Sequence, residues 1–368
     1  MNGPYFIGVD VGAGSGARIG VFDAGLDCKG KTVVPLDMYG TGPEDFVAAL
    51  AGGAGKLVRD VGIGERDVAA AGLACPGLVD AGGVLREAAN LPRLCGANLP
   101  ELFSAQYGVP AVCLNDADAG ALTVWGVEKE ELLYWVLGGG WGGAWVNAAG
   151  KVVHPWDESV RKGETAHCTN EPGQTVTLEK TELRHLFENF GASFEDFEAV
   201  YRAEEGFVEE GLAGPDGSRE AVKAELLVSG PGQLRIFRTL MAGRESAELP
   251  VSGPELDKLD SHGSGGRVLD ELARAGVEIA LEAYELFAAV FACGAHVVLK
   301  TAADEGFPAE GPVFMAGKPT QAFDVFGPML VRKLRERNFR NSLEVWNRPL
   351  PGGNVNMAGA AVAAMRVL

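Results

Sequence analysis

The chain has 368 residues, of which 47% are hydrophobic and 22% charged, so its composition is that of a soluble globular protein and its length favours two domains. Its formal net charge of -18 repels nucleic-acid phosphates and anionic lipid surfaces, so we expect neither nucleic acid nor membrane as a partner. ATP is not excluded, because a few local donors and a metal ion can offset a global field.

The chain opens with a predicted β-hairpin. Tyr5 to Val11 predict a buried strand, Gly12 to Gly16 a tight turn, and Ala17 to Phe22 a second strand. Strand, glycine turn and strand differ from the strand-to-helix order of a Rossmann or P-loop unit. Residues 43–60 then predict an amphipathic helix, which begins with Pro43 and has acidic residues in its first turn.

A second strand–glycine-turn–strand unit follows further along the chain. Leu132 to Val136 predict a strand, Gly138 to Gly143 a turn, and Ala144 to Asn147 another strand. The unit therefore occurs twice, as a weak internal repeat of architecture. Between the two units the sequence predicts strands at Val68–Cys75 and Val109–Leu114 and helices at Leu99–Tyr107 and Ala117–Trp125.

The rest of the chain continues the alternation of helices and strands. Residues 181–290 are predicted to be mainly helical, with loops or an insertion at about 204–265. The last predicted elements are a strand at Val313–Gly317, a helix at Phe323–Arg337, a strand at Leu343–Trp346 and an Ala-rich helix at Asn356–Val367. Such alternation implies layered α/β lobes.

We therefore expect two lobes. The first comprises residues 1–115, with the C-terminal helix at 354–368 packing back on it. The second and larger α/β lobe comprises residues 116–353, with a helical, partly inserted segment at about 185–290.

Cysteine usage and the N-terminal sequence both indicate a cytoplasmic protein. The six cysteines form no C-x-x-C pair, and several lie in apolar strand-like runs, so we expect them to be reduced and buried. They are Cys28, Cys75, Cys95, Cys113, Cys168 and Cys293. The first residues enter a strand without a signal-peptide pattern, and no apolar run approaches the ~18–20 residues of a membrane span.

The two glycine-rich turns are candidate phosphate cradles. In the first, a strand ends on Asp10 and the chain turns on Gly12 and Gly14, next to Ser15. Backbone N–H groups in such a turn can face a phosphate, and the acid can hold Mg²⁺ through water. The second runs from Gly138 to Gly143. Either turn alone is more typical of a plain hairpin, but together they indicate two cradles that grip one polyphosphate.

Asp116 is the candidate general base. It follows Asn115 at the end of a buried strand, and Asp118 comes two residues later. Ligands of α/β proteins bind at the carboxyl ends of strands, where a carboxylate can accept a proton from a hydroxyl that attacks phosphorus. Asn and Asp are also preferred helix N-caps, but one of these three side chains suffices for capping.

A later loop carries candidate ligands for vicinal hydroxyls. Glu164 and His167 lie three residues apart after Gly163, and Glu179 follows twelve residues beyond His167. Carboxylates accept hydrogen bonds and imidazole can donate or accept, so the set can bind vicinal hydroxyls. An ordinary surface loop with a lone His remains the alternative. Glu171 and His154 are nearby without such an arrangement.

The order of these motifs resembles the ROK family of sugar kinases and sugar-responsive regulators, within the actin-like, hexokinase-type ATPase superfamily. The resemblance covers most of residues 5–180 and about 311–368. Its best stretches are AAGLACPGLVDAGGVL, ANLP, YGVPAVCLNDADAGAL, VLGGGWGGAWVNAAGKVV, GETAH and GPVFMAG. It implies an α/β, two-lobed actin-like (ribonuclease H-like) fold, with a nucleotide and a small molecule bound in a cleft between the lobes, and a homodimer.

The resemblance also implies a role for each matching residue. Asp116 would be the catalytic base that deprotonates a sugar hydroxyl. The sugar hydroxyls would be bound by Asn90, Asn115, Glu164, His167 and Glu179. The phosphates of ATP would be bound by Asp10, Gly12, Gly14 and Ser15 of the first loop, with Asp10 holding Mg²⁺ through water, and by Gly138, Gly139 and Gly140 of the second. Gly317 would lie against adenosine.

The chain departs from the family pattern at several of these motifs. The first loop is one residue longer than usual, and Gly139 stands where the family commonly has Thr, so a hydroxyl contact to phosphate is missing. Gly317-Lys318-Pro319 replaces a run of glycines. The family's zinc-binding Cys cluster is absent, and Cys168 alone cannot supply a tetrahedral thiolate site, so we predict no zinc.

The sequence favours ATP-dependent phosphorylation of a hexose or N-acyl-hexosamine by a glucokinase-like enzyme. A non-catalytic sugar or nucleotide sensor on the same fold is the first alternative, and the altered loops favour it. DNA-binding regulation is not expected, because nothing precedes Tyr5 that could form a helix-turn-helix and the chain is strongly acidic. An actin-like kinase for another acceptor, such as a polyol or an acyl group, is the third possibility.

Overall fold

The computed structural model describes most of the chain in two compact units. The described residues are 3–12, 16–37, 39–88, 90–156, 171–204, 209–214, 217–242, 244 and 265–368. Unit 1 comprises Met1–Tyr134, Gly143–Asn170 and Trp346–Leu368, and unit 2 comprises Trp135–Gly142 and Glu171–Val345. The lobe boundary expected at residue 115 therefore falls inside unit 1, which also includes the next helix, α3 (Asp116–Glu128).

Unit 1 contains a five-stranded mixed sheet in the order β3-β2-β1-β4-β7. Its strands are β1 (Tyr5–Gly12), β2 (Gly16–Asp23), β3 (Cys28–Val34), β4 (Val68–Cys75) and β7 (Ala111–Asn115). The first three strands are antiparallel, whereas β4 and β7 run parallel to β1. The predicted hairpin is confirmed as β1 and β2. A two-stranded ribbon of β5 (Leu78–Val79) and β6 (Leu85–Glu87) follows β4.

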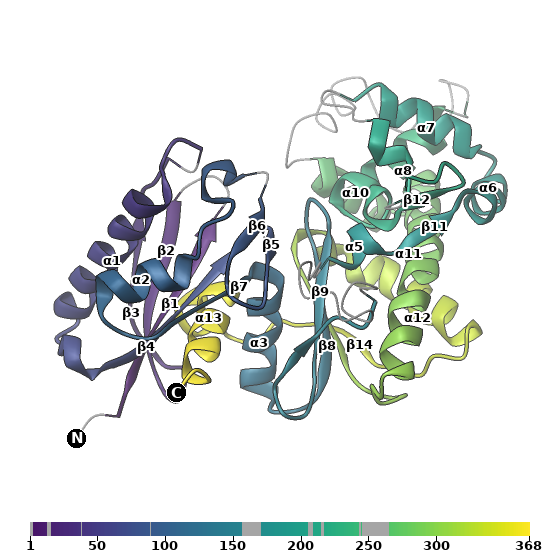
Figure 1. The fold of residues 1–368 in the computed structure, drawn as a ribbon. Coiled ribbons are helices and arrows are strands. Elements are labelled where there is room, and N and C mark those ends of the chain that lie inside the picture. The colour runs from purple at the N-terminus through teal and green to yellow at the C-terminus, as the bar shows by residue number, and fades with distance from the viewer. Residues whose placement is uncertain are drawn as a thin grey trace. The chain divides into compact units, whose positions relative to one another are not determined.

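The two faces of this sheet pack against different helices, as Figure 1 shows. Alternate residues of a strand point to opposite faces, so Ile7 and Val9 of β1 join a core with α1 (Pro43–Asp60) and α2 (Leu99–Tyr107). Phe6 lies on the other face, against α13 (Val355–Met365). Asp10 shares the face of Phe6, which places it on the α13 side of the sheet.

Helix α13 rests directly on the sheet because glycines remove side chains from between the two backbones. A Cβ added at Gly8 would lie 2.0 Å from the carbonyl oxygen of Met357, and one at Gly72 would lie 1.9 Å from that of Ala360. On the helix itself, a Cβ at Gly359 would lie 1.6 Å from the carbonyl oxygen of Ala119 in α3. The N-terminal end of α13 is therefore held against the end of β1.

The second sheet has the order β10-β9-β8-β13-β14, and the division between the units passes through its strands β8 and β9. These strands are β8 (Leu132–Leu137), β9 (Trp141–Val146), β10 (Val152–Val153), β13 (Val313–Ala316) and β14 (Leu343–Val345). A small ribbon of β11 (Thr177–Glu179) and β12 (Ala221–Lys223) belongs to unit 2. The second glycine turn connects β8 to β9, as predicted.

Unit 2 contains one long apolar helix, α11 (Glu278–Asp304). The other described helices of this unit are α5 (Pro172–Thr175), α6 (Lys180–Glu188), α7 (Phe194–Arg202), α8 (Gly230–Ala242), α10 (Gly265–Arg274) and α12 (Phe323–Glu336). Helices α6, α8, α10 and α12 pack against α11. By length and composition α11 could span a membrane, which corrects our expectation that no apolar run approaches that length. Most of its apolar window is buried, and Phe291 packs between Trp135 and Trp141, so it is a core helix.

Candidate functional site

Asp10 is the centre of a buried polar cluster in unit 1. Its Oδ2 accepts hydrogen bonds from Arg18 Nη1 at 3.0 Å and from Asn354 Nδ2 at 2.8 Å. Its Oδ1 accepts one from Asn356 Nδ2 at 3.2 Å, and only 5% of the side chain is exposed. One charged and two neutral donors offset the cost of burying this carboxylate. A carboxylate offers about four lone pairs, so Oδ1 keeps capacity for a further donor such as a water molecule.

The three partners of Asp10 come from distant parts of the sequence. Arg18 is its cross-strand partner on β2, in register across the antiparallel pair. Asn354 is the N-cap of α13, where its Oδ1 also accepts from the backbone N–H of Met357 at 2.7 Å, and Asn356 lies in the first turn. Sequence reasoning found Asp10 and missed these partners, although the two Asn before an Ala-rich helix are a capping signal.

Gly12 is the last residue of β1, at the first glycine turn. A Cβ there would lie 3.1 Å from Arg18 Nη1 and 3.3 Å from the carbonyl oxygen of Gly16. The guanidinium therefore lies against the backbone of β1 at Gly12, next to the space that a side chain there would take. Gly14 and Ser15, which the sequence assigned to the same phosphate loop, lie outside the described residues.

Asn115 and Asp116 lie where β7 meets α3. Asn115 is the N-cap: its Oδ1 accepts from the backbone N–H of Ala117 at 2.6 Å, and its Nδ2 donates to the carbonyl of Gly77 at 2.8 Å. The cap is thus supplied by Asn115 and does not require Asp116. Asp116 is half-buried at the first position of the helix, and its Oδ1 also accepts from Ala117 N, at 2.9 Å.

Asp10 and Asn115 lie at the same edge of the sheet. Asp10 of β1 is in register with Ala74 of the neighbouring β4, and Cys75 is in register with Asn115 of β7. The three strands are parallel, so their carboxyl ends meet at this edge, with Asp10 and Asn115 two strand spacings, roughly 10 Å, apart. α/β sheets bind ligands at such an edge.

A buried His–Asp pair lies beside this edge. His154 Nε2 is 2.8 Å from Asp118 Oδ1, with 8% and 13% of the two side chains exposed. The His154 ring also makes an edge contact with Trp156, with ring centroids 5.8 Å apart. The pair ties the segment after β10 to the helix that begins with Asp116. Sequence reasoning did not find this pair, because the two residues are 36 positions apart.

Only some of the predicted sugar-binding residues lie in the part of the chain that the structure describes. Asn90 is half-buried, and its Oδ1 accepts from the hydroxyl of Tyr39 at 3.3 Å. Glu179 is exposed at the end of β11, immediately before α6. Glu164 and His167 lie outside the described residues, as does Cys168. Among the residues that the structure describes, no group of three or more His, Cys, Asp or Glu could hold a metal ion.

In unit 2 the second glycine turn meets the segment that contains Gly317. Gly138 N donates to the carbonyl of Gly140 at 2.9 Å, and Gly230 N, at the start of α8, donates to the carbonyl of Gly138 at 2.9 Å. Gly317 has a φ of +102°, and a Cβ there would lie 1.8 Å from the carbonyl oxygen of Leu137. Two segments that the sequence assigned to nucleotide binding are therefore adjacent within this unit.

The carboxyl group of Glu225 lies against that turn. A Cβ on Gly140 would lie 2.7 Å from Glu225 Oε2, and Gln174 donates its Nε2 hydrogen bond to Glu225 Oε1. Lys223 Nζ donates to Gln174 Oε1 at 2.8 Å. Burial, and then the neighbouring Glu225, raise the pKa of Glu171 to about 7, and burial also raises the pKa of Glu225. The sequence did not assign Glu225 to any site.

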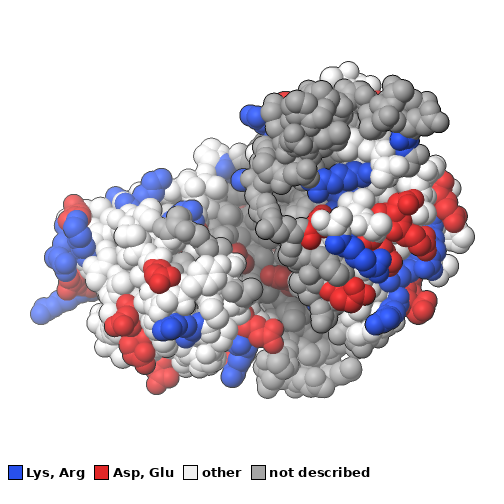
Figure 2. All heavy atoms as spheres, turned by 90° about the horizontal axis from the view of Figure 1, so that it is seen from above, with Lys and Arg blue, Asp and Glu red and all other residues white. Residues whose placement is uncertain are grey.

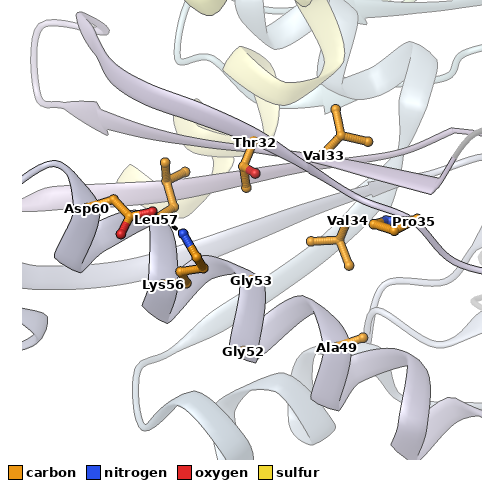
Figure 3. Close-up of a pocket in the computed structure, with 10 residues that line it drawn as sticks. All are labelled: Thr32, Val33, Val34, Pro35, Ala49, Gly52, Gly53, Lys56, Leu57 and Asp60. Carbon is orange, nitrogen blue, oxygen red and sulfur yellow. Dashed lines mark hydrogen bonds and ion pairs between the residues drawn. The ribbon is translucent and has the colours of Figure 1, made fainter.

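A cavity of about 300 Å³ lies elsewhere in unit 1, between β3 and α1. Figure 3 shows Thr32 and Val34 from the strand, with Lys56 and Asp60 from the helix. Lys56 and Asp60 are paired with each other, one helical turn apart. None of the predicted site residues lines this cavity. On the face in Figure 2, basic and acidic side chains are interspersed, without a field of one sign.

No protein-family model matches the chain, and no curated protein matches its sequence. Several solved structures share its fold. The ROK hexokinase from Thermus thermophilus has a TM-score of 0.66 and 22% identity, over 98% of each chain. The ROK family glucokinase from Streptomyces griseus, solved with glucose and AMPPNP, has a TM-score of 0.57 and 18% identity, over 98% of this chain and 99% of its own.

A regulator has the same fold as these kinases. The ROK family transcriptional regulator that is a homolog of the E. coli MLC protein has a TM-score of 0.66 and 14% identity, over 99% of this chain and 78% of its own. Fold alone therefore does not separate catalysis from sensing. The chain therefore shares the α/β fold of the ROK hexokinase and the ROK glucokinase.

Proposed function

We propose that this protein transfers the γ-phosphoryl group of ATP to a hydroxyl of a hexose or N-acyl-hexosamine. The observation that carries the proposal is the placement of Asp10 and of Asn115-Asp116 at the carboxyl edge of one parallel set of strands. The fold is shared with sugar kinases, one of which was solved with glucose and an ATP analogue.

In the proposed reaction Asp116 accepts the proton of the attacking sugar hydroxyl. The oxygen then forms its bond to the γ-phosphorus, and the bond from that phosphorus to the bridging oxygen of ADP breaks. Asn115 caps α3 and anchors to Gly77, which fixes the helix end that carries Asp116. Mg²⁺, when bound, would neutralise charge on the phosphates; the free capacity of Asp10 Oδ1 fits a magnesium-bound water.

A sensor without turnover is the second candidate, and Glu225 favours it. Its carboxylate lies against Gly140, in the turn assigned to the phosphates, where a negative charge opposes a polyphosphate. Gly139 also lacks the hydroxyl that a Thr would offer. The regulator of the same fold shows that such a scaffold also occurs outside enzymes.

The deciding experiment measures sugar-dependent ADP release from Mg-ATP with a panel of hexoses, N-acetylhexosamines and polyols. For the kinase, we expect Asp116→Asn to lower turnover by about 100-fold or more, since general base catalysis contributes roughly that factor. Sugar-induced thermal stabilisation should persist in the variant. Asp60→Asn, which removes an exposed carboxylate of α1, is the control and should keep full activity.

Equal turnover in Asp116→Asn would contradict the assigned base. Stabilisation of the wild-type protein by one sugar, with no ADP released by any acceptor, would identify the sensor instead.

A further inference from the structure

On the face of the β1–β2 hairpin that carries Asp10, a charged pair of residues is followed, toward the turn, by a pair without side chains. Asp10 and Arg18 are directly opposite each other, and the next pair on the same face is Gly12 and Gly16. Neither glycine has a side chain to cover the guanidinium. Arg18 Nη1 accordingly lies near Gly12, 3.1 Å from where a Cβ would be, and 43% of the Arg18 side chain is exposed.

Arg18 retains most of its donor capacity. A guanidinium has five N–H donors in a planar fork, and among the described residues one hydrogen bond of this side chain is recorded, to Asp10. Asp10 itself does not depend on Arg18 alone, because Asn354 and Asn356 also donate to it. The charge that Asp10 holds in place is therefore available at the glycine turn.

We propose that Arg18 binds the polyphosphate of the nucleotide directly, and that Asp10 is the positioning residue that orients it. Arg18 would thus supply a local positive charge for an anion in a chain of net charge -18. The planar fork suits paired phosphate oxygens, and one ion pair keeps it from rotating away. This role rests on the proposed function for its ligand, a nucleoside triphosphate, although a free polyphosphate offers the same chemistry.

The rival role for Arg18 is structural, as a counter-charge for the buried Asp10. Binding in the absence of magnesium separates the two roles. A counter-charge acts through Asp10 and its metal water, so its loss would leave metal-free anion binding unchanged. A direct ligand contributes with or without metal, and its contribution falls as salt screens the charge.

The test is calorimetric titration of the full-length protein with inorganic tripolyphosphate, ATP and adenosine, all in excess EDTA. We expect Arg18→Gln to weaken tripolyphosphate and ATP binding by about 10-fold to 100-fold and to leave adenosine unchanged. Arg18→Lys should restore part of the loss, because it keeps the charge without the fork. Arg59→Gln, which breaks an exposed ion pair with Glu65 on α1, is the matched control and should bind like wild type.

Asp10→Asn removes the negative charge but keeps a side-chain oxygen that can accept the Arg18 hydrogen bond, so the guanidinium stays oriented. If Arg18 is the anion ligand, removal of the nearby negative charge should leave metal-free tripolyphosphate binding as tight as in wild type or tighter. Weaker metal-free binding in Asp10→Asn with unchanged binding in Arg18→Gln would overturn the assignment.

The same proteins are assayed for sugar-dependent ADP release, so that failure of the Arg18 contact can be distinguished from failure of the proposed kinase activity. Loss of tripolyphosphate binding in Arg18→Gln without any turnover in wild type supports the Arg18 contact and removes the kinase. Turnover in the wild type, together with unchanged metal-free binding in Arg18→Gln, would support the kinase activity and contradict the contact between Arg18 and the polyphosphate. Absence of both anion binding and turnover in wild type overturns both. A preference for ATP over tripolyphosphate in wild type identifies the nucleotide as the ligand.

Discussion

Single side chains in this protein do several tasks at once. Asn354 caps α13 with its oxygen and donates to Asp10 with its nitrogen. Asn115 likewise caps α3 and anchors to Gly77. Because each amide joins a helix end to a strand end, the backbone and the polar edge of the sheet are positioned together.

The Glu171–Glu225 pair makes stability depend on pH. A carboxyl whose folded pKa is about 7 against an ordinary 4.5 binds protons more tightly in the folded state. Its favourable contribution is complete below about pH 4.5 and is lost as the pH rises through about 7. We expect Glu171→Gln to gain stability over wild type across this window, by about 1–3 kcal/mol.

Urea unfolding at several pH values between about 4.5 and 8 measures this difference. Glu310→Gln, at an exposed position of unit 2, is the control and should track the wild type. A difference between Glu171→Gln and wild type that stays constant over the range would contradict the raised pKa.

At the scale of elements, unit 1 is organised by the close approach of α13 to the sheet. Gly8 and Gly72 on the strands and Gly359 on the helix each face a backbone carbonyl at a distance that no Cβ tolerates. Because these positions carry no side chains, α13 packs directly against the sheet. Its N-cap residue, Asn354, can therefore donate a hydrogen bond to Asp10.

Gly72→Ala should displace α13. The new methyl would meet the Ala360 carbonyl at 1.9 Å, and overpacking of this kind costs about 1–3 kcal/mol or more. Chemical denaturation would show the loss of stability. Gly52→Ala is the matched control: nothing lies within 4 Å of a Cβ there, and in α1 it should stabilise by up to about 1 kcal/mol. Equal stability of Gly72→Ala and Gly52→Ala would show that the close packing of α13 on the sheet does not require a glycine at position 72.

The whole molecule is built from discontinuous units. The chain enters unit 2 at Trp135, returns to unit 1 at Gly143, enters unit 2 again at Glu171 and ends in unit 1 from Trp346 onward. The last 23 residues thus complete a unit that begins with the first. Unit 2 has its own core around α11.

Deletion of residues 354–368 should open unit 1 selectively. It removes α13 and both Asn donors of Asp10, and exposes the face of β1 and β4 that α13 covers. Hydrogen exchange should become fast in β1 and β4 while α11 stays protected. Deletion of only Val367 and Leu368, which are 43% and 71% exposed, should change nothing. Retained protection of β1 in the longer deletion would contradict this dependence.

The sequence predicted features whose cause is local. The hairpin of β1 and β2 follows from apolar runs around glycines, and the N-cap before α3 follows from Asn115. Strand β3 was missed, because it is an edge strand with alternate exposed residues, including two lysines, and has no apolar run. The Asp10 cluster and the position of Glu225 were missed because their partners meet only through tertiary packing.

The closure of unit 1 by its last helix also sets an order of events during synthesis. At roughly 5–20 residues per second, about 20–70 s of synthesis separate Asp10 from Asn354, which is 344 positions later in the chain. Until then β1 has neither the donors for Asp10 nor a cover for one face of its sheet. A nascent chain that has not reached Asn354 therefore lacks the Asp10 cluster.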